Sequence, residues 1–276
     1  MSTEARVLPP LPKGFDFPFY YASLDSFWAY YQVDAGKLVP YLEHTGLMPA
    51  LFEGKALVNI NFQRYTSHLS LGLSTVTEVE FNLVSYPASQ ERGVPTLSVD
   101  DYLSGQDQTK LIGNYRLHVA ADNQFAVNAG IKAFGEPKFV TTFTNTTVPA
   151  LNDPTVTTWT IECDDPEDKA AGQYIFRLLA NPVTLRPQSQ SLSPITGYTL
   201  YNKRLLGSRW NLFGAYSSAT QVKSELVQLT FGASPNQMRL DMQALIGSTP
   251  AYALQHFASP PAATEGRGYY VDPEER

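Results

Sequence analysis

The most chemically suggestive residue in the sequence is Lys138, which follows a short turn that runs from Gly135 to Pro137. Gly135 permits a tight turn, and Pro137 fixes its own φ and biases Glu136 toward an extended conformation. Lys138 therefore has a defined position, and two apolar residues follow it. Burial beside apolar residues would disfavour the ammonium form and lower the pKa of Lys138. A neutral amine attacks a carbonyl group to form a Schiff base, whereas most lysines remain in solvent.

Two acidic residues, Glu78 and Glu80, lie two positions apart in a strand-like segment and therefore project from the same face, together with Asn82. By pattern alone, this polar face is expected to contact solvent. The alternative is a polar interior lining that holds a ligand. In that case the neighbouring carboxylates would raise each other's pKa, which is how a carboxyl group becomes a general acid near neutral pH.

These side chains must be positioned by strands, because alternation of apolar and polar residues recurs along the chain. The segments with this pattern are Ala56–Arg64, Thr75–Tyr86, Tyr115–Val119, Trp159–Cys163, Tyr174–Leu178 and Val227–Phe231. Short helices are predicted after three capping residues, Asp34, Asp122 and Asn236. The pattern predicts one α+β domain over residues 1–276, mostly antiparallel sheet or barrel with a few peripheral helices. Residues 1–14 and 260–276 are expected to be loosely ordered tails.

Composition excludes several classes of protein. The chain of 276 residues is 43% hydrophobic and 17% charged, which argues against disorder, and its net charge of −6 argues against a nucleic-acid partner. No apolar run reaches the ~18 residues of a membrane-spanning helix. The N-terminal segment lacks the apolar core of a secretory signal, so we expect a cytoplasmic protein with no membrane partner. Cys163 is the single cysteine.

Histidine spacing gives no indication of a metal site. His44, His68, His118 and His256 form neither an HxH nor an HExxH motif, so each is expected to be an ordinary structural residue. A hydrolase or isomerase that uses His118 or His68 is a conceivable function, but nothing in the spacing supports it.

The block from Ala129-Gly130 to Pro137-Lys138 resembles the signature of the acetoacetate decarboxylase superfamily, in which a helix of small residues leads to a Pro-Lys pair. The segment Thr75–Val84 resembles the strand that carries the family's catalytic glutamate. Leu57–Asn61 and Asp34–Pro40 resemble the preceding strand and an early helix. The resemblance covers about residues 15 to 257, and only the block Gly130–Lys138 is specific.

This resemblance implies a cone-shaped antiparallel barrel with peripheral helices and an interior active site. It assigns Lys138 as the Schiff-base nucleophile and Glu78 as the acid/base residue. It also implies a homo-oligomer that acts on a small carbonyl compound without a cofactor. Acetoacetate decarboxylase is itself the standard example of a lysine activated by its surroundings.

The sequence departs from the family pattern where the substrate carboxylate would be bound. Phe139 replaces the second lysine, and Phe19–Tyr31 contains no arginine. A second acidic position of the family falls near Asn61 or Gln63. Arg64, Arg116 or Lys132 could supply the missing cation. The residues expected to bind substrate are Asn61, Gln63, Glu80, Arg116 and Glu136, and the aromatic content predicts a substrate larger than acetoacetate.

The function predicted from these residues is a Schiff-base-forming lyase that acts on an oxo-acid or related carbonyl compound, by decarboxylation or by aldol-type chemistry. The alternative is a non-catalytic protein that binds small molecules on the same scaffold. The two differ at Lys138, because an exposed or ion-paired amine favours the binding protein.

Overall fold

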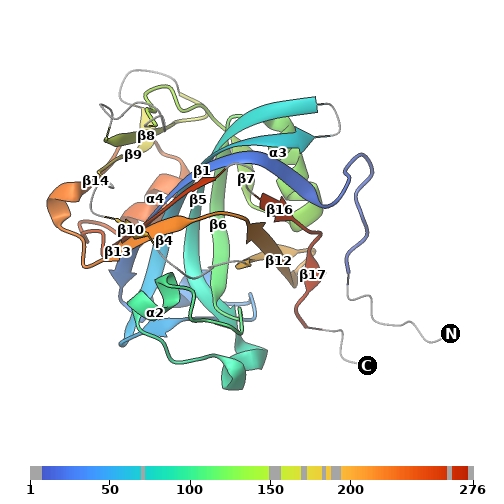
Figure 1. The fold of residues 1–276 in the computed structure, drawn as a ribbon, viewed down its shortest axis with the longest axis horizontal. Coiled ribbons are helices and arrows are strands. Elements are labelled where there is room, and N and C mark those ends of the chain that lie inside the picture. The colour runs from blue at the N-terminus through green and yellow to red at the C-terminus, as the bar shows by residue number, and fades with distance from the viewer. Residues whose placement is uncertain are drawn as a thin grey trace.

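The computed structural model describes residues 8–69, 72–148, 157–168, 173–181, 185–187, 194–259 and 263–272. These residues form a large, mostly antiparallel sheet, a small second sheet and a few short helices (Figure 1). The predicted fold class is therefore confirmed, and each of the six segments with alternating residues lies in a strand.

Seven strands of the large sheet form a closed circuit of hydrogen-bonded neighbours, because β1 pairs with both β16 and β4. In the order of the circuit they are β1 (Phe19–Val33), β4 (Lys55–Leu69), β5 (Gly72–Pro87), β6 (Gly113–Ala121), β11 (Ile195–Tyr201), β12 (Arg204–Leu212) and β16 (Ala263–Glu265). The pairing of β11 with β6 is parallel, and the other pairings around the circuit are antiparallel.

Shorter strands extend this circuit or form the second sheet. The extensions are β2 (Leu47–Pro49), β3 (Leu51–Phe52), β7 (Lys138–Val140), β10 (Arg186–Pro187), β13 (Tyr216–Thr220), β15 (Ala253–Ser259) and β17 (Tyr269–Tyr270). The second sheet consists of β8 (Trp159–Asp164), β9 (Tyr174–Ala180) and β14 (Val227–Phe231). The helices are α1 (Val39–Leu42), α2 (Val99–Leu103), α3 (Gln124–Ala129) and α4 (Gln237–Leu245).

Two of the predicted helix caps are present. Asp34 accepts a hydrogen bond from the Gly36 amide at the start of a 3₁₀ turn that precedes α1, and Asn236 accepts one from the Met238 amide at the start of α4. The prediction for Asp122 is wrong, because Asn123 caps α3. Asp122 instead accepts a hydrogen bond from the Thr77 amide, which ties β5 to the segment that leads into α3.

The apolar faces of β4 and β5 contribute to a core cluster that includes Phe62, Phe81, Trp159 of the second sheet and Met242 of α4. In Figure 1, α4 and the second sheet lie at one end of the molecule and α3 and β7 at the other. α4 and the second sheet cover the apolar face of β4 and β5. The opposite, polar face of these two strands points into the strand circuit. Glu78 and Glu80 are each 4% exposed. The expectation that this face contacts solvent is therefore wrong, and the alternative of a polar interior holds.

The end of the chain was also expected to be a loosely held tail, and this is wrong for its described part, residues 263–272. β16 pairs with β1 and β12, and β17 pairs with β12. Main-chain hydrogen bonds to two strands hold this segment in the sheet. As a result, Glu265 is buried inside the circuit.

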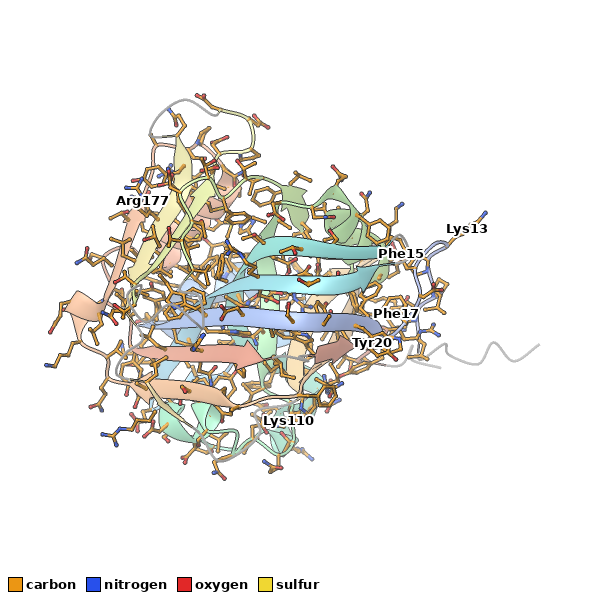
Figure 2. All side chains as sticks on the ribbon, turned by 45° about the horizontal axis from the view of Figure 1, so that its top comes forward. Lys13, Phe15, Phe17, Tyr20, Lys110 and Arg177 are labelled. Carbon is orange, nitrogen blue, oxygen red and sulfur yellow. The ribbon has the colours of Figure 1, made fainter. Side chains whose placement is uncertain are left out.

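Aromatic side chains close the end of the sheet near α3. The segment before β1 places Phe15 and Phe17 there (Figure 2), where Phe17 stacks on Phe19 at 4.5 Å between ring centroids and packs edge-on against Phe134. Across the described parts of the chain, no helix combines the length and the apolar character that a membrane crossing requires.

Candidate active site

The turn before Lys138 brings the lysine side chain into the strand circuit. α3 continues into a π-helical turn, Gly130–Phe134, a distortion often found at functional sites. Gly135 then has a φ of 67°, as the predicted turn requires, and a Cβ atom at this residue would lie 2.5 Å from the Leu200 carbonyl oxygen. β7 begins at Lys138 and pairs with β6 in parallel, with Lys138 beside Val119.

Gly130 allows the helical turn to approach the lysine closely. A Cβ atom at Gly130 would lie 2.6 Å from Cδ of Lys138, and closer still to a carboxylate oxygen of Glu136. A residue with a side chain would therefore displace both groups, so glycine at this position is needed for the packing of the site.

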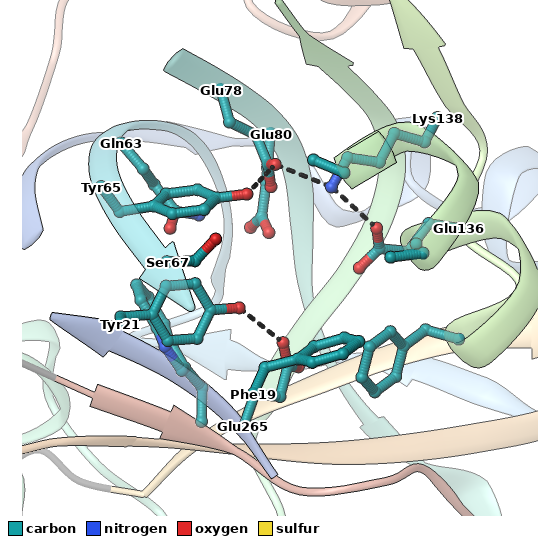
Figure 3. A pocket seen from close by; sticks show the side chains of 15 residues that line it. Phe19, Tyr21, Gln63, Tyr65, Ser67, Glu78, Glu80, Glu136, Lys138 and Glu265 are labelled. Carbon is teal, nitrogen blue, oxygen red and sulfur yellow. Dashed lines mark hydrogen bonds and ion pairs between the residues drawn. The ribbon is translucent and has the colours of Figure 1, made fainter. Parts of the chain in front are cut away.

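The Lys138 amine is buried between two carboxylates (Figure 3). Its Nζ atom lies 2.7 Å from Oε2 of Glu78 and 3.3 Å from Oε2 of Glu136, and the lysine side chain is 5% exposed. Burial acts to lower the pKa of Lys138, but the negative charges of Glu136 and Glu78 outweigh it and raise the pKa above its ordinary value. The prediction of a lowered pKa is therefore wrong, because both carboxylates stabilise the ammonium.

Glu78 connects the lysine to the polar face of β4. It lies beside Gln63 in the strand register, and Oε2 of Glu78 accepts a hydrogen bond of 3.0 Å from the Tyr65 hydroxyl. Burial raises the pKa of Glu78, and the nearby charge of Lys138 acts against this shift. A buried carboxyl with a raised pKa beside an amine is suited to accept and return a proton.

Arg116 pairs with three carboxylates, one of which, Glu136, also pairs with Lys138. Its guanidinium nitrogens lie 2.9 Å from Glu80, 3.4 Å from Glu136 and 3.6 Å from Glu265. Burial acts to raise the pKa of Glu80, but Arg116 and hydrogen bonds from Asn82 and Asn61 lower it overall. Because Arg116 already faces three carboxylates, its charge is not free for a substrate carboxylate.

The other candidate cations lie elsewhere. Arg64 is half-buried on β4 and does not line the pocket that contains Lys138, and Lys132 is exposed on the helical turn before Gly135. Neither of them therefore takes the place of the family's arginine or second lysine at this site.

A pocket of about 40 Å³ lies in front of the Lys138 amine, which is room for about three water molecules. Five predicted site residues line it: Gln63, Glu78, Glu80, Glu136 and Lys138. Asn61 and Arg116 do not line the pocket. Both lie behind Glu80 and donate hydrogen bonds to its carboxylate. The pocket is smaller than the aromatic content suggested, because aromatic side chains such as Phe19 and Phe134 fill space at its edge.

Sequence reasoning missed five polar residues that line the pocket: Tyr21, Tyr65, Ser67, Trp210 and Glu265. Tyr65 and Ser67 continue the alternation of Asn61 and Gln63 along β4, so the two-residue period could have identified them. Trp210 and Glu265 face each other across β12 and β16. No local pattern indicates this pair, because it depends on which strands become neighbours.

The three histidines whose side chains the structure describes do not line this pocket. His118 is paired with Asp241 at 2.7 Å and His256 with Asp25 at 3.0 Å, whereas His44 is exposed. The side chain of His68 lies outside the described residues. Within the described residues, no group of three or more His, Cys, Asp or Glu side chains is arranged to hold a metal ion.

Solved structures similar to this chain share one architecture. Acetoacetate decarboxylase from Legionella pneumophila has a TM-score of 0.64 at 12% identity, over 96% of this chain and 92% of that one. The chain has the fold of the acetoacetate decarboxylase-like enzymes. An acetoacetate decarboxylase-like enzyme from Sphingomonas wittichii has a TM-score of 0.58 at 14% identity, over 94% of each chain.

A third structure of the acetoacetate decarboxylase-like fold is the enduracididine biosynthesis enzyme MppR. It was solved with the condensation product of pyruvate and imidazole 4-carboxaldehyde, and has a TM-score of 0.57 at 13% identity, over 95% of this chain and 88% of that one. No protein-family model matches the chain, and no curated protein sequence matches it either.

Proposed function

We propose that this protein is a Schiff-base-forming lyase that acts on a small carbonyl compound through Lys138. The observation that carries the proposal is the position of the buried Lys138 amine, which borders a pocket and lies 2.7 Å from the Glu78 carboxylate. A lysine is activated as a nucleophile when a neighbouring base can take its proton. Glu78 is such a base, and burial raises its pKa toward the range in which it can hold that proton.

The proposed reaction starts with transfer of one proton from the Lys138 ammonium to Glu78. The free amine adds to the carbonyl carbon, and a proton moves from nitrogen to oxygen to give a carbinolamine. Glu78 then returns its proton to the hydroxyl group, and water leaves. The products are an iminium on Lys138, one water molecule and the original Glu78 carboxylate, so atoms and charge balance.

The iminium is an electron sink for the carbanion left when a neighbouring C–C bond breaks or a proton is lost. Decarboxylation and aldol-type cleavage or condensation both use this intermediate. Support for both reaction types comes from proteins of the same fold, which include acetoacetate decarboxylase and an enzyme solved with a condensation product of pyruvate.

A non-catalytic binding protein is the second candidate, and one observation favours it. Glu136 and Glu78 raise the pKa of Lys138, so the resting amine is an ammonium and not a nucleophile. In that case the ion pairs would stabilise the scaffold, and ligands would bind without covalent chemistry.

Trapping with borohydride separates the two functions. The protein is incubated with an anionic carbonyl compound (acetopyruvate, pyruvate or acetoacetate), a neutral one (acetone) or a cationic one (aminoacetone), reduced with borohydride, and analysed by mass spectrometry after proteolysis. The lyase predicts an adduct on Lys138 that is absent from the Lys138→Ala variant and unchanged in Lys132→Ala, the matched exposed lysine. Absence of an adduct with every carbonyl compound, or equal adduct in Lys138→Ala, contradicts the lyase and leaves the binding protein.

A further inference from the structure

The residues at this pocket carry more acidic than basic groups. Lys138 pairs with Glu78 and Glu136, and Arg116 pairs with Glu136, Glu80 and Glu265. Four carboxyl groups therefore share two cations, which leaves two negative charges in excess when all are ionised. A buried excess charge is costly, so the cluster is stabilised by taking up either protons or an additional cation.

Four buried polar atoms of the pocket residues lack a hydrogen-bond partner within the described part of the chain. One of them, Oε2 of Glu136, faces the Lys138 ammonium at 3.3 Å. The other three are Oε1 of Glu265, Oγ of Ser67 and Nε1 of Trp210. The three residues are 6%, 2% and 5% exposed, so water at the surface does not satisfy them. Buried polar groups are rarely left unpaired in folded proteins. Their presence together on the wall of one pocket indicates that ordered water, or the polar atoms of a ligand that displaces it, binds there.

Glu265 is the acceptor among these groups. Its Oε2 atom accepts a hydrogen bond of 3.2 Å from Tyr21, whereas Oε1 has only the Arg116 guanidinium at 3.6 Å. In Figure 3, Glu265 and Tyr21 lie apart from Lys138, and the Ser67 hydroxyl lies between the rings of Tyr65 and Tyr21. A ligand whose carbonyl carbon meets Lys138 would therefore present its other end to Glu265.

The charged and titratable groups that face Glu265 are Tyr21 of β1, Glu80 of β5, Arg116 of β6, Glu136 before β7 and Lys138 of β7. Burial raises the pKa of Glu265 to about 7, Arg116 acts against this shift, and Glu136 and Glu80 add to it. Glu265 is thus about half protonated at neutral pH, and a cationic ligand would take the place of this proton. A substrate carboxylate would instead add a further negative charge to the cluster.

We propose that the substrate is a small carbonyl compound whose other end is a cationic amine, and that Glu265 binds this amine. The carbonyl part of this inference rests on the proposed lyase function, whereas the cation site does not. The amine would donate hydrogen bonds to Glu265 and reduce the excess negative charge. The volume of about 40 Å³ favours a small compound.

The test uses three probes of similar size that contain no carbonyl group: 2-aminoethanol as the cation, ethylene glycol as the neutral compound and glycolate as the anion. Dissociation constants are measured by NMR titration of the full chain. We expect 2-aminoethanol to bind about tenfold or more tightly than glycolate, as a charge-assisted hydrogen bond predicts. Its affinity should rise from about pH 6 to about pH 8, because Glu265 loses its proton in this range.

Two variants assign the preference to Glu265. Glu265→Gln should reduce the preference for the cation about tenfold and remove its pH dependence. Glu225→Gln removes one negative charge at an exposed residue, as Glu265→Gln does at the pocket. It should leave the preference for the cation and its pH dependence unchanged. The inference is overturned if the three probes bind equally or if glycolate binds most tightly. It is also overturned if the preference for 2-aminoethanol persists in Glu265→Gln.

The outcome is independent of the trapping experiment, because none of the probes forms an imine. A protein that binds the cation but fails to form a borohydride adduct refutes the lyase and supports the cation site. A protein that forms the adduct but prefers glycolate supports the lyase and overturns the cation site.

Discussion

The amine of Lys138 and the carboxylate of Glu78 lie 2.7 Å apart, and each side chain is 5% exposed. This pair holds a proton that either group can carry, because burial disfavours the charged form of both. The second carboxylate, Glu136, stabilises the ammonium and raises the pKa of Lys138. The proposed reaction therefore requires proton transfer within the pair, and not a lysine that is neutral at rest.

Replacement of Glu78 by Gln should slow both imine formation and turnover. The amide preserves the shape of the side chain but can neither take the proton of the Lys138 ammonium nor return it to the leaving hydroxyl group. We expect borohydride trapping on Lys138 to become slower and turnover of the trapped carbonyl compound to fall by about 10²- to 10⁴-fold, the usual contribution of a general acid/base. Glu91→Gln, at an exposed residue, is the matched control. Unchanged turnover in Glu78→Gln would remove Glu78 from the mechanism.

The raised pKa of Glu265 predicts how stability depends on pH. A carboxyl whose pKa is about 7 in the folded protein and 4.5 in its ordinary state binds its proton more tightly when folded. Its contribution to the free energy of unfolding is therefore present below about pH 4.5 and is lost as the pH rises through about 7. We expect this contribution to be roughly 3 kcal/mol.

Urea denaturation of the wild type and of Glu265→Gln at about pH 5 and about pH 7 measures this contribution. The decrease in the free energy of unfolding between the two pH values should be smaller in the variant, because the amide does not titrate. The same decrease in both proteins would show that Glu265 has an ordinary pKa.

Replacement of Gly130 by Ala should disturb the lysine through packing alone. The added Cβ atom would lie 2.6 Å from Cδ of Lys138, so the lysine and Glu136 must shift. We expect a loss of about 1–3 kcal/mol in the free energy of unfolding, typical of overpacking, together with slower borohydride trapping. In Gly266→Ala the added atom meets no neighbour within 4 Å, so both quantities should remain near wild type. Wild-type trapping in Gly130→Ala would show that this close contact is dispensable.

Much of the fold follows from local pattern. Alternation identifies the six strand segments, and Asp34 and Asn236 are recognisable as caps because capping depends mainly on adjacent residues. Asp122 and Asn123 are adjacent and both residue types cap helices equally well, so local sequence does not distinguish them. Which of the two does so depends on the Thr77 amide of a distant strand, with which Asp122 forms its hydrogen bond.

The sequence by itself determined that Glu78 and Glu80 share a strand face and that the turn at Gly135 precedes Lys138, since both depend on neighbouring residues and their backbone geometry. Only the tertiary structure decided that this face points inward, because that depends on the pairing of β1 with β4 and on the cover provided by α4 and the second sheet. It also decided the direction of the Lys138 pKa shift and the presence of Glu265, since electrostatic energy depends on distances between charges that come from separate strands.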